Sequence, residues 1–163
     1  MELRIASRAD LGAVDALLSR SYPALLKADY PPSVLVTALP LISRANPALL
    51  RSGTYWIAEE GGRLVGAGGW TAAAPVAGEG APGLANVRHV VSDPGALRRG
   101  VARAVLGAAM AQARLAGMRG VAALSTRTAV PFYAALGFAV IEETEIALRP
   151  GIDFPAVRMA RRL

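Results

Sequence analysis

The sequence predicts a mixed α/β domain, in which short strands and helices follow one another on both sides of a central hairpin. Three observations predict this class. The chain has 163 residues, of which 53% are hydrophobic, which is enough for one domain with a buried core. Apolar residues recur with period two in several short runs and with helical spacing in longer ones. Glycine and proline separate these runs, as is typical of turns.

The first third of the chain predicts one strand followed by two helices. Residues 2–6 alternate polar and apolar side chains, which is typical of a short strand. A helix is expected to end at about Tyr22, because Ser7 or Asp10 can cap its start and apolar residues recur on one face. A second helix is expected over residues 33–44, with a kink at Pro40, which has no N–H to donate.

The clearest local signal is a β-hairpin. Residues 54–58 and 64–70 form two apolar runs that predict paired strands. Residues 59–63 lie between them and contain two consecutive glycines, so they predict the turn. The stretch 72–83, rich in glycine, alanine and proline, predicts a flexible loop.

The rest of the chain continues the alternation. It predicts in order a strand, a helix, a strand, a helix and two closing strands, over residues 84–91, 99–117, 121–125, 130–136, 138–148 and 156–162. Gly117 and Gly137 stand where the two helices should end, and Pro131 lies in the first turn of the second. We find no internal repeat and no linker, so a single domain over residues 1–163 is expected.

Composition argues against several classes of protein. The chain has no cysteine, which excludes a disulfide framework and thiolate chemistry. It has one histidine, His89, which argues against a zinc site. The longest near-apolar run, residues 34–43, is far shorter than the roughly 20 residues of a membrane span. No signal peptide is visible at residues 1–5. A cytoplasmic protein without a membrane partner is therefore expected.

Positive charge is concentrated in one part of the sequence. The formal net charge is +6, and the segment 80–141 carries that whole excess, with seven arginines and one acid, Asp93. A basic segment predicts an anionic partner, either a nucleic acid or a phosphorylated small molecule. A general compositional preference for arginine and alanine is the alternative, although it does not explain the clustering.

A strand, a basic loop and a helix follow one another within residues 88–106. The first turn of a helix has unpaired N–H groups and a partial positive charge, so it is suited to bind an anion. The loop and this first turn contain three arginines and two small residues: Arg98, Arg99, Arg103, Gly100 and Ala102. The small residues would let a phosphate approach the backbone. An ordinary exposed arginine-rich loop is the alternative interpretation.

This loop resembles the coenzyme A pyrophosphate loop of the GCN5-related N-acetyltransferase (GNAT) superfamily. The family pattern is Gln/Arg-x-x-Gly-x-Gly/Ala, and Gly100 and Ala102 match its two small positions. Leu97 stands at the first position, where the family has glutamine or arginine. A second segment, residues 126–138, is similar to the family's short helix with Phe-Tyr followed by Leu-Gly-Phe. The hairpin and the closing strands also match, so the resemblance covers residues 1–162.

The resemblance implies a GNAT fold, a twisted and mostly antiparallel sheet of six or seven strands with helices on both faces. It implies acetyl-CoA as the acetyl donor, bound in an opening between the fourth and fifth strands. A backbone N–H at Val90 or Val91 would bind the thioester carbonyl, and the pyrophosphate would lie against residues 98–103. The expected acetyl-CoA-binding residues are Val90, Val91, Ser92, Arg98, Arg99, Gly100, Val101, Ala102, Arg103 and Thr126.

The resemblance also implies two catalytic residues. Tyr133 occupies the family's Phe-Tyr position, where the phenol protonates the departing thiolate; orienting the sulfur, or a purely structural role in the core, are the alternatives. His89 is the candidate base for the amine, because no acid lies on the fourth strand. A histidine buried in the sheet or exposed at the surface is the alternative. Glu59, Glu60, Asp29 and a water chain are the other candidates for the base.

The expected function is therefore transfer of an acetyl group from acetyl-CoA to a primary amine. The acceptor stays open: a small amine, an amino acid, a peptide N-terminus or a lysine, recognised by residues 22–51 and 149–155. A second copy of the chain, as a homodimer, is compatible with this function. The alternatives are a regulatory domain that binds acyl-CoA without turnover and a nucleic-acid-binding module, although no RNA- or DNA-binding motif is visible. An acetyltransferase acting on charged tRNA would combine two of these.

Overall fold

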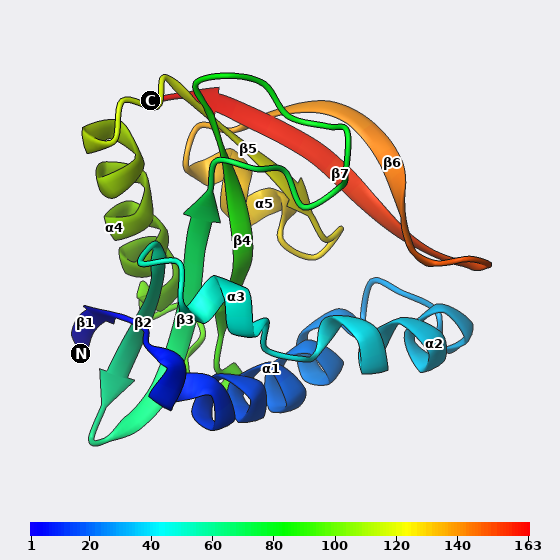
Figure 1. The fold of residues 1–163 in the computed structure, drawn as a ribbon. Helices are drawn as coiled ribbons and strands as arrows, with labels where there is room; N and C mark the ends of the chain where they lie inside the picture. Colours follow the sequence, from blue (N-terminus) through cyan, green and yellow to red (C-terminus); the bar gives the residue numbers. More distant parts are fainter.

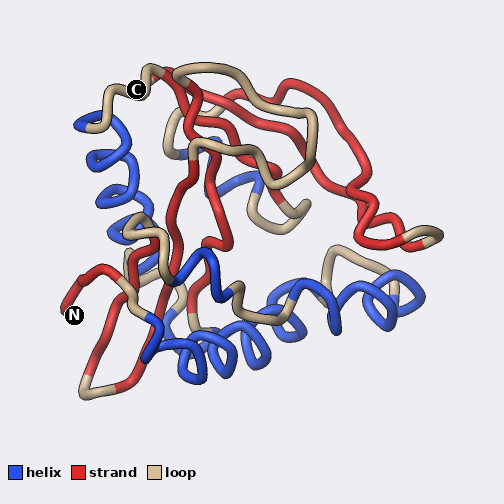
Figure 2. The backbone as a smooth tube through the Cα atoms, in the orientation of Figure 1, coloured by secondary structure: helices blue, strands red, loops and turns tan.

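The backbone forms one seven-stranded sheet with helices on both faces (Figures 1 and 2). The structure is a computed structural model and describes all 163 residues. The strands are β1 (Glu2–Ile5), β2 (Tyr55–Glu60), β3 (Arg63–Thr71), β4 (Leu84–Ser92), β5 (Gly120–Ser125), β6 (Ala139–Arg149) and β7 (Ile152–Arg162). The helices are α1 (Leu11–Leu26), α2 (Pro32–Ile42), α3 (Pro47–Leu50), α4 (Val101–Leu115) and α5 (Val130–Ala135). Short 3-10 helices, Arg8–Asp10 and Pro94–Ala96, precede α1 and α4.

The sheet order is β1-β2-β3-β4-β5-β7-β6. Every neighbouring pair is antiparallel except β4 and β5, which are parallel. This arrangement confirms the predicted fold class.

Two apolar layers fix which helix covers which face. Val14 and Leu17 of α1 pack with Ile57 of β2 on one face. Leu106 of α4 and Tyr133 of α5 pack with the opposite face. The helix α2 packs on the same side as α1, where it meets β7 (Figure 1). Burial of these side chains is the main force that holds each helix on the sheet.

Four local expectations differ from the structure. The last strand, β7, begins at Ile152 instead of residue 156, because residues 152–155 already pair with β6. The helix α1 does not end near Tyr22 but continues through Pro23 to Leu26. Proline removes only one helical hydrogen bond, and Leu26 is fully buried in the cluster with Phe154, which favours the extra turn.

The other two differences concern short segments. The hairpin turn contains only Gly61 and Gly62, both with positive φ, because Glu59 and Glu60 already pair with β3. The short helix α3 was not predicted. It begins because the Asn46 side chain accepts hydrogen bonds from its first backbone N–H groups.

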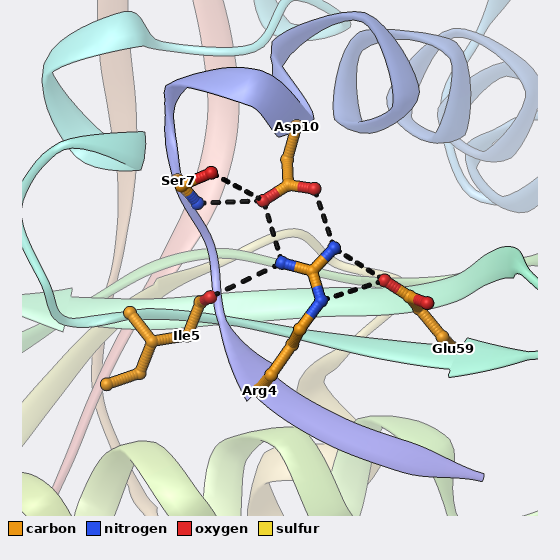
Figure 3. Close-up of polar contacts among 5 residues, drawn as sticks. All are labelled: Arg4, Ile5, Ser7, Asp10 and Glu59. Carbon is orange, nitrogen blue, oxygen red and sulfur yellow. Dashed lines mark hydrogen bonds and ion pairs between the residues drawn. The ribbon is translucent and has the colours of Figure 1, made fainter.

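An ion cluster at Arg4 ties β1, the start of α1 and β2 together (Figure 3). The Arg4 guanidinium donates to Asp10 at 2.7 Å and to Glu59 at 2.6 Å. Asp10 also accepts from the backbone N–H of Ser7 at 2.7 Å, so it caps the turn that leads into α1. The Arg4 guanidinium holds the pKa of Asp10 below its usual value. The cluster therefore fixes the N-terminal edge of the sheet.

The helix α4 approaches β3 unusually closely because β3 contains glycines. A Cβ added at Gly66 would overlap Val101 Cγ1. A Cβ added at Gly68 would lie 2.8 Å from Val90 Cγ2 and 3.1 Å from Val105 Cγ1. The absence of side chains at Gly66 and Gly68 thus brings the first turn of α4 against the middle of the sheet.

Candidate functional site

The site begins where β4 and β5 separate. These strands pair only over three positions, from Leu84–Gly120 to Asn86–Ala122. Beyond them β4 stays with β3 while β5 stays with β7, so the two strands diverge. A cavity of about 500 Å³, lined mostly by hydrophobic residues, opens at this divergence. The first turn of α4, the end of β5 and α5 complete its walls. The opening predicted between the fourth and fifth strands is confirmed.

A β-bulge in β4 shapes one wall of this cavity. Gly68 of β3 faces two residues of β4, His89 and Val90, because Ala67 pairs with Val91 while Gly69 pairs with Arg88. His89 has a positive φ of 45°, which is uncommon for a residue other than glycine. The Tyr55 hydroxyl donates a hydrogen bond to the His89 carbonyl at 3.0 Å and thereby holds the bulge.

The bulge reverses which residues of β4 face each helix layer. Before it, Ala85 and Val87 pack on the α4 side. After it, Val91 packs on the α1 side. His89 and Val90 have no partner in the strand register. Both residues line the cavity. The Tyr55 hydroxyl already occupies the His89 carbonyl, which leaves the Val90 N–H as the backbone donor to consider at this wall.

The first turn of α4 forms the polar end of the cavity. Gly100 precedes the helix in a left-handed conformation, with φ of 78°. The first helical hydrogen bond runs from the Ala104 N–H to the Gly100 carbonyl at 2.9 Å. The N–H groups of residues 101–103 precede it and have no side-chain cap. The Arg98 and Arg103 side chains line the same region. These donors and charges suit a bound anion.

Asp93 fixes the loop that leads into α4. Its carboxylate accepts a hydrogen bond from the Gly95 backbone N–H at 2.8 Å. It also pairs with Arg20 of α1 at 2.7 Å and with Arg63 of β3 at 3.1 Å. These partners hold the pKa of Asp93 below its usual value. The only acid of the basic segment is thus structural.

The structure brings the predicted site residues together, with one exception. Those that line the cavity are His89, Val90, Val91, Ser92, Arg98, Gly100, Val101, Ala102, Arg103, Thr126 and Tyr133. Arg99 does not line it, because its guanidinium turns to β2 and pairs with Glu60 at 2.6 Å. The Thr126 hydroxyl oxygen accepts from the Ala129 N–H at 3.2 Å, within the turn that precedes α5.

Tyr133 projects from α5 into the apolar part of the cavity. Its ring meets Phe132 and Phe138 edge to face, with centroids 5.2 Å apart in both pairs. Burial raises the pKa of Tyr133, because the phenolate would be poorly solvated. Tyr22 enters the same cavity from α1, and burial raises its pKa to about 12. Both hydroxyls are therefore protonated donors at neutral pH.

His89 lies at the junction of two cavities. It lines the first cavity and also a second one of about 470 Å³, and the two cavities share Tyr22, Val87, Leu124 and Thr126 as well. Burial, assisted by the neighbouring Arg88, lowers the pKa of His89 to about 4. The imidazole is therefore neutral at pH 7.

The carboxylates considered as alternative bases lie elsewhere. Glu59 pairs with Arg4, and Glu60 pairs with Arg99. Asp29 accepts a hydrogen bond from the Thr128 hydroxyl at 2.7 Å. None of the three lines either cavity. His89 is the one predicted candidate for the base that the fold brings to the site.

The second cavity is lined by both predicted and unforeseen segments. Leu41, Ile42 and Phe154 lie in the regions expected to recognise an acceptor. The loop 75–77 and the β6 residues 146–148 were not foreseen as part of the site. The loop between β3 and β4 reaches across β7 (Figure 2). An ion pair at its tip, from Arg158 of β7 to Glu79, holds it there at 2.9 Å.

Comparison with known proteins adds to this geometry. The family model described as an acetyltransferase (GNAT) domain matches residues 51–140. A search of curated protein sequences finds no match. Among the helices, none has the length and apolar character needed to cross a membrane.

Solved structures with the same fold include several acetyltransferases. A GCN5-related N-acetyltransferase from Rhodopseudomonas palustris aligns with a TM-score of 0.78 and 18% identity, over 99% of this chain and 95% of that one. The PaiA N-acetyltransferase from Thermoplasma acidophilum, solved with coenzyme A, has a TM-score of 0.69 and 17% identity, over 99% and 98%. YncA from Salmonella typhimurium, solved with its cofactor acetyl-CoA, has a TM-score of 0.67 and 17% identity, over 100% and 94%.

The family match covers the hairpin, the bulged strand, the basic loop and Tyr133. Of these, the bulged strand, the basic loop and Tyr133 line the cavity. The chain therefore belongs to the GNAT family and is an acyltransferase.

Proposed function

We propose that the protein transfers the acetyl group of acetyl-CoA directly to the primary amine of an acceptor. The observation that carries this proposal is the pair of cavities that meet at His89, of which only the first ends at the first turn of α4. A donor and an acceptor could enter from opposite sides and react at that junction. Two proteins with the same fold were solved with coenzyme A or acetyl-CoA, which supports the choice of donor.

The first cavity suits acetyl-CoA along its length. The free N–H groups of residues 101–103 would bind the pyrophosphate, and Arg98 and Arg103 would add positive charge. Apolar walls would contact the pantetheine arm. The Val90 N–H, outside the strand register, would donate to the thioester carbonyl. One such donor stabilises a developing oxyanion by about 3 kcal/mol in other enzymes.

The chemistry proceeds by direct attack. The neutral amine nitrogen forms a bond to the thioester carbon, and the carbonyl oxygen becomes an oxyanion. Collapse of this intermediate breaks the carbon–sulfur bond. The nitrogen loses one proton and the departing thiolate gains one, so the products are an amide and free CoA.

His89 orients the amine in this proposal rather than storing its proton. A pKa of about 4 lies far below the roughly 10.4 of an alkylammonium group. Transfer of a proton between them would be uphill by about 9 kcal/mol. A neutral imidazole can still accept a hydrogen bond from the amine, and the proton then leaves through water in the second cavity.

This role predicts a specific pH dependence. The imidazole is neutral at all pH values well above about 4, so its protonation does not change between pH 6 and 9. The rise of kcat/KM in that range should follow the acceptor's amine. We expect His89→Asn to lower kcat/KM while leaving the inflection of the pH–rate profile in place. An inflection near pH 6–7 that disappears in His89→Asn would instead identify His89 as the base.

Tyr133 supplies the proton or hydrogen bond that the thiolate needs. Burial raises the pKa of Tyr133, and the same apolar surroundings would raise the pKa of the departing thiol, so the two pKa values move in the same direction. We expect Tyr133→Phe to lower kcat about 100-fold, because general acid catalysis contributes about that much or more. Affinity for CoA, measured by isothermal titration, should stay within about twofold.

A matched control tests whether removal of any buried tyrosine hydroxyl would lower kcat as Tyr133→Phe is expected to do. The Tyr30 hydroxyl donates to the Pro155 carbonyl at 2.7 Å, accepts from the Arg127 backbone N–H at 2.8 Å and lies outside both cavities. Tyr30→Phe removes both hydrogen bonds, so it should lower stability by about 2 kcal/mol and leave kcat unchanged. Full activity in Tyr133→Phe would remove Tyr133 from the mechanism.

The test of the function as a whole is titration with acetyl-CoA followed by an amine screen that detects thiol release. We expect saturable binding of acetyl-CoA that free CoA competes away, and thiol release that depends on the amine. A folded protein that binds acetyl-CoA but turns over no amine would favour the regulatory alternative. A folded protein without binding would contradict the proposal.

A further inference from the structure

Arg88 is a half-buried arginine without an acidic partner. It lies on β4 just before the bulge and lines the second cavity. Its guanidinium donates to the Thr71 hydroxyl at 3.2 Å, which is a neutral acceptor. Burial lowers the pKa of the Arg88 guanidinium, and no carboxylate contacts it to offset this effect.

Of the four other partly buried arginines, three have carboxylate partners, and the fourth, Arg161, donates to the Leu136 carbonyl at 2.7 Å and to the Arg162 carbonyl. Arg4 pairs with two carboxylates, Arg20 pairs with Asp93, and Arg158 pairs with Glu79 and Glu142. Partial burial of a charge is costly unless the charge is paired. Arg88 also has five N–H donors, of which a single hydroxyl uses one. The chain therefore leaves Arg88 free to bind an anion.

The rest of the second cavity indicates what accompanies that anion. No acidic residue lines either cavity, so nothing there favours an acceptor with several positive charges. The walls of the second cavity are mainly apolar and include Ile42, Val76, Ile146 and Phe154. Such walls favour burial of an apolar group. The cavity thus combines one cation with a hydrophobic surface.

The position of Arg88 limits the distance between the acceptor's charge and its amine. Arg88 is the neighbour of His89, and His89 lies at the junction with the first cavity. An amine that reacts at this junction has its carboxylate within reach of Arg88 when only a few bonds separate the two groups. A positive charge beside the amine also lowers the pKa of the ammonium form, which increases the fraction of reactive free base.

We propose that the acceptor is a free α-amino acid with an apolar side chain. Its carboxylate binds the Arg88 guanidinium, its side chain occupies the second cavity, and its α-amine lies at His89. This inference rests on the proposed acetyl transfer and narrows it to one class of amine.

The test compares amino acids with their carboxamides. L-Leucine, L-methionine and L-phenylalanine are each assayed for acetyl-CoA-dependent thiol release at pH 8, beside the corresponding amino acid amides. The amide amine is the weaker base and is more fully deprotonated at this pH, so a preference for the acid reports recognition of the carboxylate. We expect at least one acid to exceed its amide in kcat/KM by about 10-fold or more, as for a charged hydrogen bond.

Variants of Arg88 connect this preference to one side chain. Arg88→Gln should remove the preference for the acid, mainly through KM, and should leave kcat/KM for the amide within about twofold. Arg88→Lys should keep part of it. Arg114→Gln, at an exposed position on α4, is the matched control and should behave as the unmodified protein. Thermal unfolding of each variant verifies that it is folded.

The outcomes separate this inference from the proposed function. Amides that react as well as acids, or a preference that survives Arg88→Gln, would overturn the role of Arg88. Turnover of benzylamine, cadaverine or a peptide N-terminus without turnover of any amino acid would overturn the inference and leave acetyl transfer intact. Bound acetyl-CoA with no amine turned over would also overturn it. Failure to bind acetyl-CoA would overturn both.

Discussion

Gly100→Glu is expected to weaken the binding of CoA by about 100-fold or more. Gly100 directly precedes α4, and the space around its Cβ position is open. A glutamate there would place its carboxylate beside the N–H groups that the pyrophosphate needs. Two like charges a few ångströms apart in a partly desolvated site repel by several kcal/mol, and each 1.4 kcal/mol changes affinity tenfold. Isothermal titration with CoA measures the effect.

A second variant separates charge from backbone strain. Gly100 has φ of 78°, a conformation that costs a residue with a Cβ about 1 kcal/mol. Asparagine tolerates this region better than other side chains and carries no charge. Gly100→Asn should therefore weaken CoA binding by less than about tenfold. If Gly100→Glu bound CoA as tightly as the unmodified protein, the pyrophosphate would have to lie elsewhere.

Most of the fold could be predicted because its signals are local. The hairpin, the helix α4 and the closing strands each have an apolar period of their own and a glycine or proline at their ends. The basic loop was identifiable for the same reason, since its small residues and arginines are contiguous. The end of α1 was missed because burial of Leu26 against Phe154 joins segments far apart in sequence.

The bulge in β4 illustrates what the sequence did not reveal. Residues 88–91 form an unremarkable stretch of strand, with no glycine to indicate the positive φ of His89. The bulge depends on space left by Gly68 and on the hydroxyl of Tyr55, both from other strands. Its effect is large, because it decides that Val90 rather than Val91 lies on the α4 side.

Side-chain direction around the basic loop was equally hidden. Arg98 and Arg99 are adjacent arginines that the sequence gives no reason to distinguish, yet only Arg98 lines the cavity. Arg98 has a positive φ of 61°, which turns the chain so that Arg99 points to Glu60 of β2. Arg88 was counted as part of the basic segment, and its lack of a carboxylate partner became visible only in three dimensions.

Gly66→Ala is expected to lower both stability and CoA affinity, through the same contact. The added Cβ would overlap the Cγ1 atom of Val101, which is the first residue of α4. Val101 is fully buried and β-branched, so it has little freedom to turn away. Overpacking of this kind costs about 1–3 kcal/mol, and we expect a value near the upper end, measured by urea unfolding. Displacement of the first turn of α4 should also weaken CoA binding.

Two further variants test whether that contact is the cause. Gly107 lies on the same helix with nothing within 4 Å of its Cβ position, so Gly107→Ala should be neutral or stabilising by up to about 1 kcal/mol. Adding Val101→Ala to Gly66→Ala removes the overlapping methyl groups. The double variant should then be more stable than the sum of the two single effects predicts, since residues in contact are not additive.

If the stability changes of Gly66→Ala and Val101→Ala simply added in the double variant, the proposed contact between β3 and α4 would be contradicted. A recovery of stability together with CoA affinity would show that the glycines of β3 serve the site as well as the core. The distance between helix and sheet would then set the position of the pyrophosphate-binding N–H groups relative to the bulge at His89. A change at the buried face of β3 would act on the substrate without touching it.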